Sequence, residues 1–93
     1  MGEQIFDSVW DALEDSPEQA ANMRLRSQLM TALQECIAEW NLTQADAASK
    51  LKVTQPRLND LLRGRIDKFS LDALIELASR AGIQVRLELK RAA

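Results

Sequence analysis

Apolar residues recur at steps of three and four along the segment that follows Pro17. The apolar positions are Ala20, Met23, Leu29, Met30, Leu33, Ile37 and Trp40. This spacing predicts an amphipathic helix from about Pro17 to Trp40, long enough to bend near Asn22. Ser16 is a good N-cap before a proline at the first helical position, and Gln19 stands at the capping-box position.

Two shorter helices are predicted directly afterwards, over about Gln44–Leu51 and Gln55–Arg63. Thr43 and Thr54 are the N-cap residues of these helices, and Gly64 is a natural C-cap. Because so few residues separate the two helices, they must cross steeply, which is the helix-turn-helix arrangement. The apolar residues expected to hold them together are Ala48, Val53, Leu58, Leu61 and Leu62.

The pattern changes period near the end of the chain. Ser70 caps a further helix, LDALIELASRA, which Gly82 ends and whose expected inward face is Leu71, Leu74, Ile75 and Ala78. Beyond it, apolar and polar residues alternate strictly over Ile83–Lys90. Such alternation predicts a half-buried strand.

A single strand leaves its backbone N–H and C=O groups unpaired and needs a neighbour. With no credible second strand in the chain, we expect the same strand of another copy, paired antiparallel across a two-fold axis. A frayed tail is the alternative. The expected dimer-interface residues are Ile83, Val85, Leu87 and Leu89.

The predicted architecture is therefore mainly α, a bundle of about five helices with a C-terminal β-strand. The first helix lies over Ser8–Glu14, within an acidic N-terminal extension of residues 1–16. Residues 17–93 form the helix-turn-helix domain, whose dimerisation strand spans residues 83–90.

The net charge of -2 conceals a strong asymmetry along the chain. Residues 1–22 contain six Asp and Glu and no Lys or Arg, whereas residues 41–69 contain six Lys and Arg against three Asp. Two surfaces with different partners are indicated, the basic one suited to phosphate.

Several functional classes are disfavoured by the composition. Histidine is absent, Cys36 is the single cysteine, and there is no glycine-rich phosphate loop or metal-ligand spacing. We therefore expect no enzyme activity, no cofactor and no metal. The chain has no run of eighteen apolar residues and no secretory leader, so we expect a cytoplasmic protein with no membrane association.

The second helix of the pair carries side chains suited to reading DNA. A recognition helix presents its N-terminal residues to base edges in the major groove. The expected base contacts are Thr54, Gln55, Pro56, Arg57 and Asn59, since Gln and Asn match adenine and Arg matches guanine. The expected phosphate contacts are Thr43, Gln44, Lys52, Arg63, Arg65 and Lys68. Asp60 is expected to pair with Arg57 or Arg63.

The run LTQADAASKLKVTQPRLNDLLRG, residues 42–64, resembles the lambda-repressor-like (XRE/Cro type) helix-turn-helix family. The matching features are Thr43-Gln44-Ala45, Ala48, Val53-Thr54-Gln55 and Leu61-Leu62 with Gly64. The resemblance implies that Gln44 contacts phosphate and that Thr54, Gln55, Pro56 and Asn59 face the groove. Lys52 departs from the family, which often has glycine there, so a positive φ is expected at this lysine.

The segment FSLDALIELASRAGIQVRLELK is similar to the end of HigA-like antitoxins, where a helix is followed by a dimerising strand. This resemblance implies a dimeric repressor that binds a palindromic operator in double-stranded DNA, regulates its own promoter and neutralises a basic RelE-type toxin. The acidic segment Glu3–Glu18 would be the toxin-facing surface; the alternative is a solubilising helix that packs Val9, Trp10 and Leu13 on the body of the same protein. A stand-alone XRE-family regulator without a toxin, and an interaction module that has lost DNA binding, are the alternatives.

Overall fold

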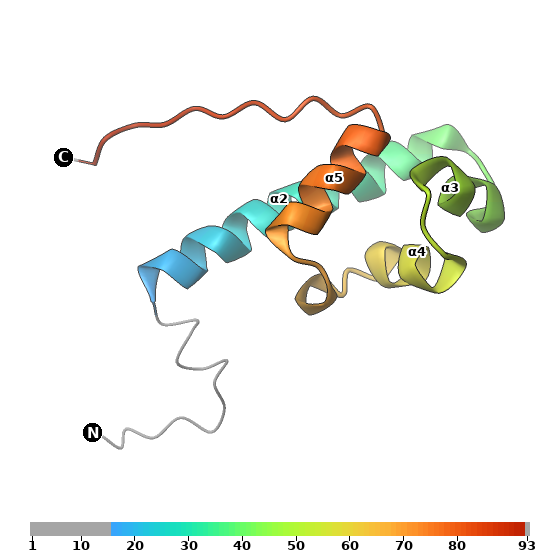
Figure 1. Ribbon diagram of the computed structural model, residues 1–93, viewed down its shortest axis with the longest axis horizontal. Helices are drawn as coiled ribbons and strands as arrows, with labels where there is room; N and C mark the ends of the chain where they lie inside the picture. The colour runs from blue at the N-terminus through green and yellow to red at the C-terminus, as the bar shows by residue number, and fades with distance from the viewer. Residues whose placement is uncertain (1–15, 93) are drawn as a thin grey trace, which may run out of the picture.

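The computed structural model describes residues 16–92. Its elements are α2 (Pro17–Trp40), α3 (Gln44–Leu51), α4 (Gln55–Leu62), the 3-10 turn η1 (Ile66–Lys68) and α5 (Leu71–Arg80). The long helix α2 carries α5 along its middle and the α3–α4 pair at its far end (Figure 1). The four α-helices predicted after residue 16 are therefore present. The helix predicted over Ser8–Glu14 lies outside the described residues.

Each of the four helices starts at a hydroxyl N-cap. The cap oxygen accepts a hydrogen bond from the backbone N–H three residues later, at 3.0 to 3.2 Å. The caps are Ser16, Thr43, Thr54 and Ser70, as the sequence predicts. These bonds satisfy donors that the helix itself leaves unpaired. The helix α2 runs as 24 residues through Asn22 without the possible break.

The helices α3, α4 and α5 end in one shared way. A residue in the left-handed region follows each helix: Lys52 at φ 60°, Gly64 at φ 74° and Gly82 at φ 82°. At α4, for example, the Gly64 N–H donates to the Leu61 carbonyl at 3.1 Å and the Arg65 N–H to the Asp60 carbonyl at 3.0 Å. This cap satisfies carbonyls at the helix end and favours glycine. The positive φ expected at Lys52 is confirmed.

The core is built where the apolar stripes of the helices meet. Its buried members are Met30, Leu33, Ile37, Ala47, Ala48, Leu51, Leu58, Leu61, Phe69, Leu74, Leu77 and Ala78. Of the expected core residues between α3 and α4, Ala48, Leu58 and Leu61 are buried, while Val53 and Leu62 are partly buried against the core. On α5 the prediction for Ile75 is wrong, because the buried stripe is Leu74, Leu77 and Ala78 and Ile75 is 40% exposed on the neighbouring face.

The C-terminal segment is anchored at one point and then runs free of helix and sheet. The Ile83 N–H donates to the Ala78 carbonyl at 2.9 Å, and residues 83–92 form neither helix nor strand. The predicted strand over residues 83–90 is thus not formed in the single chain, because a strand requires a hydrogen-bonded neighbour and the described residues supply none. Leu87 and Leu89 are 80% and 81% exposed. The segment runs back on the side of α2 away from α4 (Figure 1).

Candidate nucleic-acid interface

The helices α3 and α4 form a helix-turn-helix, and the C-terminal end of each helix is hydrogen-bonded to a side chain from the rest of the molecule. Arg80 of α5 donates to the Leu51 carbonyl at 3.2 Å, at the end of α3. Gln34 of α2 donates from Nε2 to the Leu61 carbonyl at 2.9 Å, at the end of α4. Arg80 therefore supplies a donor to a carbonyl at the end of α3, and Gln34 adds a second donor to the Leu61 carbonyl, which also accepts from the Gly64 N–H; these bonds hold the pair in a set orientation.

The first two turns of α4 present two amide side chains. Gln55 is exposed and Asn59 is half-buried. Residues four apart lie on one helix face, so the two amides are neighbours. Among residues 16–92, neither amide has a hydrogen-bond partner. The exposed Thr54 and Pro56 lie beside them.

Arg57, also predicted to contact bases, lies against the protein itself. Its Nη1 donates to the Lys68 carbonyl at 2.8 Å. Its guanidinium carbon lies 4.0 Å from the centroid of the Phe69 ring, a cation–π distance. The structure therefore separates Arg57 from Gln55 and Asn59, because its cationic group faces the loop that follows α4.

That loop, residues 65–69, is also hydrogen-bonded to Arg26 of α2. Arg26 is 7% exposed and is the buried charged residue of the described chain. Its Nη1 donates to the carbonyls of Ile66 at 3.2 Å and Phe69 at 3.4 Å, and its Nε donates to Asn22 Oδ1 at 2.7 Å. The sequence analysis missed Arg26. The available signal was a charged residue standing at helical spacing within the apolar stripe of α2.

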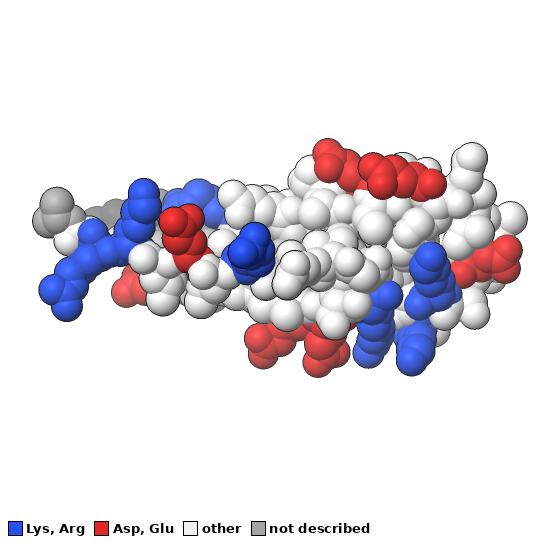
Figure 2. Space-filling model, turned by 90° about the horizontal axis from the view of Figure 1, so that it is seen from above, with Lys and Arg blue, Asp and Glu red and all other residues white. Residues whose placement is uncertain are grey.

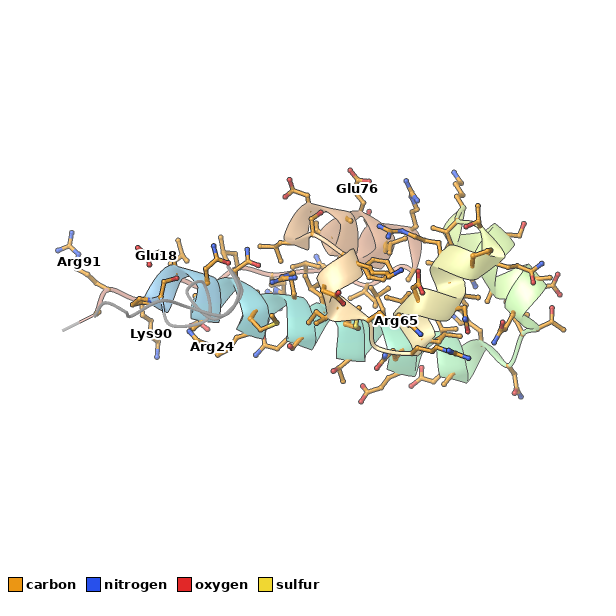
Figure 3. The ribbon with its side chains drawn as sticks, turned by 90° about the horizontal axis from the view of Figure 1, so that it is seen from below. Glu18, Arg24, Arg65, Glu76, Lys90 and Arg91 are labelled. Carbon is orange, nitrogen blue, oxygen red and sulfur yellow. The ribbon has the colours of Figure 1, made fainter. Side chains whose placement is uncertain are left out.

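The predicted phosphate-binding residues surround α4 but are not equally free. Lys52 and Arg63 are exposed and have no ion-pair partner within residues 16–92. Asp60, in contrast, lies 3.7 Å from Arg65 Nε and 3.9 Å from Lys68 Nζ. The prediction that Asp60 pairs with Arg57 or Arg63 is therefore wrong, since the chain turns back at Gly64 and brings the loop cations to it. Figure 3 shows Arg65 beside α4 on the underside of the molecule.

The remaining charged groups fall into separate areas. Lys and Arg side chains gather toward the α3 end of the face in Figure 2 and again along the C-terminal segment, with acidic side chains on the edges between. Thr43 and Gln44 are exposed at the start of α3. Lys50 lies over the Trp40 ring at 4.3 Å from its centroid, so part of its charge is directed at the protein.

Two further features bear on the class of protein. No helix within residues 16–92 has the length and apolar character needed to cross a membrane. The same residues contain no cluster of His, Cys, Asp and Glu that could hold a metal ion. Cys36 is half-buried, with Sγ 3.8 Å from the Ala81 carbonyl oxygen.

The fold and the exposed face of α4 define a helix-turn-helix protein. The chain belongs to the helix-turn-helix domain family, which it matches over residues 12–90. This membership indicates a DNA-binding regulator. No curated protein matches the chain.

Proposed function

We propose that this protein is a sequence-specific transcriptional repressor of the lambda-repressor-like (XRE) type, without enzyme activity. The observation that carries the proposal is the pair of unpartnered amides, Gln55 and Asn59, at the start of a helix fixed at its far end by Gln34. Amides held on a rigid helix can read base edges with little loss of conformational entropy.

The surrounding groups support contact with the DNA backbone. Lys52 and Arg63 flank α4, and Gln44 lies at the start of α3, where backbone N–H groups and the helix dipole favour phosphate. These residues would fix the position of the protein on the duplex, while the amides discriminate between bases.

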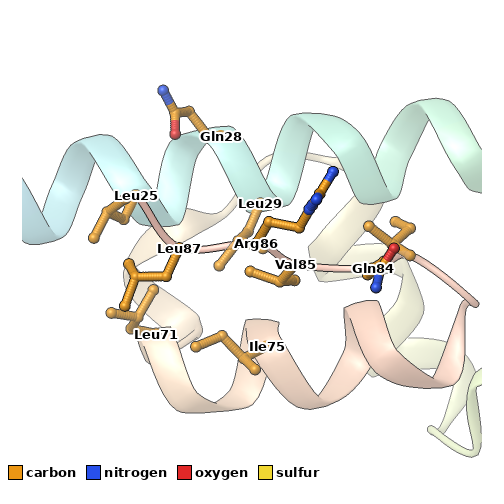
Figure 4. Close-up of a pocket in the computed structure, with 10 residues that line it drawn as sticks. Leu25, Gln28, Leu29, Leu71, Ile75, Gln84, Val85, Arg86 and Leu87 are labelled. Carbon is orange, nitrogen blue, oxygen red and sulfur yellow. The ribbon is translucent and has the colours of Figure 1, made fainter. Parts of the chain in front are cut away.

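The C-terminal segment supports a homodimer on a palindromic operator. A groove of about 300 Å³ lies between α2, α5 and this segment, and Leu25, Leu29, Leu71 and Ile75 line it (Figure 4). Pairing residues 83–90 with those of a second copy would satisfy the open backbone groups and cover exposed leucines beside this groove. The segment lies away from α4, so such a pairing would leave both reading helices accessible.

Charge selects one register for this pairing. In an antiparallel pair with the two-fold axis at Leu87, Arg86 faces the second copy's position 88, which is a glutamate, and position 85 faces position 89, both apolar. An axis at Arg86 or at Glu88 would instead place two identical charges opposite each other. An axis midway between two neighbouring residues would place apolar residues opposite polar ones. An axis at Val85 would leave Arg86 opposite a glutamine, and an axis at Leu89 would place Leu87 opposite position 91, an arginine. We therefore place the axis at Leu87, where the positions on either side of it pair apolar with apolar and basic with acidic.

Within this proposal the protein is a HigA-like antitoxin that represses its own promoter and binds a basic RelE-type toxin. The support is compositional: residues 1–22 carry six acidic residues and no basic ones. Electrostatic complementarity of this kind favours a basic partner. Co-purification with the product of a neighbouring reading frame tests this point, and loss of that binding on deletion of residues 1–16 would assign the surface. Operator binding without such a partner would favour the stand-alone regulator.

Fluorescence anisotropy with duplexes from upstream of the protein's own coding region tests the DNA-binding proposal. We expect one segment to bind at least tenfold more tightly than a scrambled duplex of the same composition. The Gln55→Ala/Asn59→Ala double variant should lose that preference and keep the weak binding common to all duplexes. Absence of binding to any duplex at low salt would favour the interaction module instead.

A further inference from the structure

We infer that α4 reads adenine in A·T base pairs through Gln55 and Asn59, and that Arg57 is a positioning residue and does not read guanine. This inference rests on the proposed function and specifies the bases that the site recognises.

The first step concerns the available cations. Thr54–Arg63 contains two basic residues, Arg57 and Arg63. The side chain of Arg57 is occupied by the Lys68 carbonyl at 2.8 Å and by the Phe69 ring. Arg63 is the C-cap of α4, far from the N-terminal turn that enters a major groove. Within Thr54–Arg63, no free cation therefore stands in the N-terminal turn, where an arginine would bind the O6 and N7 atoms of guanine.

The second step concerns the groups that are free. A primary amide carries an acceptor oxygen and donor N–H groups side by side, which matches the N6 donor and N7 acceptor of adenine. Gln55 and Asn59 each supply one such amide on the same helix face. Pro56 beside Gln55 adds an apolar surface suited to the methyl group of thymine.

The third step gives Arg57 its role. Its hydrogen bond joins α4 to the backbone of the loop that carries Arg65 and Lys68. From the opposite side, Arg26 binds the carbonyls of Ile66 and Phe69 in the same loop. Two arginines therefore hydrogen-bond to the backbone of this loop. Arg57 would fix the distance between the base-reading amides on α4 and the loop cations that bind phosphate.

Selection from a randomised duplex library tests the inference. The proteins are the wild type, Gln55→Ala, Asn59→Ala, Arg57→Met and Arg63→Met as the matched control. Arg57→Met keeps chain length and an apolar contact with Phe69 but removes the donor and the charge. Affinities are measured at a temperature where circular dichroism shows every variant folded, and Arg57→Leu, which also lacks the donor and the charge, is substituted if the methionine variant does not fold.

We expect wild-type selection to enrich A·T pairs at the contacted positions. Gln55→Ala and Asn59→Ala should each lose one of these preferences, a change of about 5- to 150-fold in discrimination. Arg57→Met should keep every preference and the wild-type salt dependence, while its affinity falls several-fold for all sequences. Arg63→Met should also keep the preferences but reduce the slope of log affinity against log salt by about one.

Loss of a guanine preference in Arg57→Met would overturn the inference and leave the proposed repressor standing. Unchanged affinity in folded Arg57→Met would overturn the positioning role, because a residue that only stabilises the fold would behave in that way. A wild-type protein that enriches no sequence would instead overturn the proposed function.

Discussion

The helix-turn-helix end and the C-terminal segment differ in how far this chain satisfies its own polar groups. At the helix-turn-helix end, hydroxyl caps satisfy backbone donors, and Gln34, Arg80, Arg26 and Arg57 donate to carbonyls at helix ends and in the loop. Beyond Ile83, residues 84–92 form neither helix nor strand, and Leu87 and Leu89 are exposed. One chain therefore suffices to order the helix-turn-helix, whereas the terminal segment keeps its leucines exposed in the single chain, where the proposed dimer would bury them.

The largest expected effect comes from breaking the proposed strand pairing with prolines at Val85 and Leu87. Proline removes a ladder donor, and these positions belong to no helix or strand of the single chain, so the fold should remain intact. We expect sedimentation to change from dimer to monomer. Affinity for a palindromic operator should fall by about 10²- to 10⁴-fold, because each half-site is then bound separately.

Charge exchange sharpens the same test. Arg86→Glu or Glu88→Arg alone should weaken the dimer, and the double exchange should restore it if the axis lies at Leu87. An unchanged dimer in the proline variant would place the interface elsewhere. Failure of the double exchange to restore the dimer would reject this register.

The second prediction concerns Arg26, at the satisfied end of the molecule. Arg26→Met keeps much of the side-chain volume but leaves the Phe69 carbonyl without the Arg26 donor, while the Ile66 carbonyl keeps its bond from the Phe69 N–H at 3.2 Å. We expect a loss of about 1–3 kcal/mol in the free energy of unfolding, measured by urea denaturation, since that is the cost of one unsatisfied buried polar group.

Arg24→Met is the matched control, because Arg24 is an exposed arginine two positions earlier on α2. Its effect should stay within about 0.5 kcal/mol. Similar losses in the two variants would show that the buried hydrogen bonds of Arg26 contribute little, and the contrast between the two regions would lose its energetic basis.

The third prediction concerns Asp60, whose carboxylate pairs with Arg65 and Lys68 and would compete with DNA for these two cations. Asp60→Asn removes a negative charge 3.7 Å from Arg65 and 3.9 Å from Lys68. Exposed ion pairs contribute about 0.2–1 kcal/mol, so we expect DNA affinity to rise by roughly two- to fivefold for all sequences at low salt. Glu76→Gln, whose carboxylate pairs with Arg80 on α5, is the control and should leave affinity unchanged. Lower affinity in Asp60→Asn would show that Asp60 orders the loop for binding.

The sequence predicts the features that depend on neighbouring residues and does not predict those that depend on residues distant in the chain. Helix starts and ends depend on local chemistry, a hydroxyl before each helix and a left-handed residue after it, and the sequence predicts them at Thr43, Thr54, Ser70 and Gly82. The orientation of Arg57 depends on Phe69, twelve residues away and beyond a turn, so no local pattern reveals it. The role of Arg26 depends on carbonyls forty or more residues away.

The strand shows a different limit. Strict alternation correctly predicts that residues 83–90 do not continue the helix. Alternation cannot show whether a strand forms, because strand formation depends on a hydrogen-bonded neighbour that the pattern of one segment does not describe. Ile75 shows a related limit: the apolar pattern of α5 predicts it on the inward face, whereas in the structure it is exposed and lines the groove beside the C-terminal segment.

The smallest expected effect concerns Lys52, which has an unfavourable backbone conformation within the helix-turn-helix. The C-terminal caps of α4 and α5 have glycine in the left-handed position, but that of α3 has Lys52 at φ 60°. The left-handed conformation costs a residue with a Cβ about 1–2 kcal/mol, and glycine loses about 0.5–1 kcal/mol more backbone entropy on folding. Lys52→Gly should therefore raise the free energy of unfolding by about 0.5–1 kcal/mol in urea denaturation. Gly64→Ala, at the equivalent position after α4, should have the opposite sign, and its added Cβ would meet Gln34 Nε2 at an ordinary 3.6 Å, so backbone strain alone should account for the loss.

The same Lys52→Gly variant also separates stability from function. If Lys52 contacts a phosphate, the variant should bind DNA more weakly while being more stable, and the slope of log affinity against log salt should decrease by about 0.9. A stability gain with an unchanged salt slope would exclude the phosphate contact but keep the strain. If neither the stability nor the salt slope changed, the turn would accommodate lysine without cost and Lys52 would contact no phosphate. The combination of higher stability and weaker binding would show that a cation is retained in the turn for DNA, at a position where folding alone favours glycine.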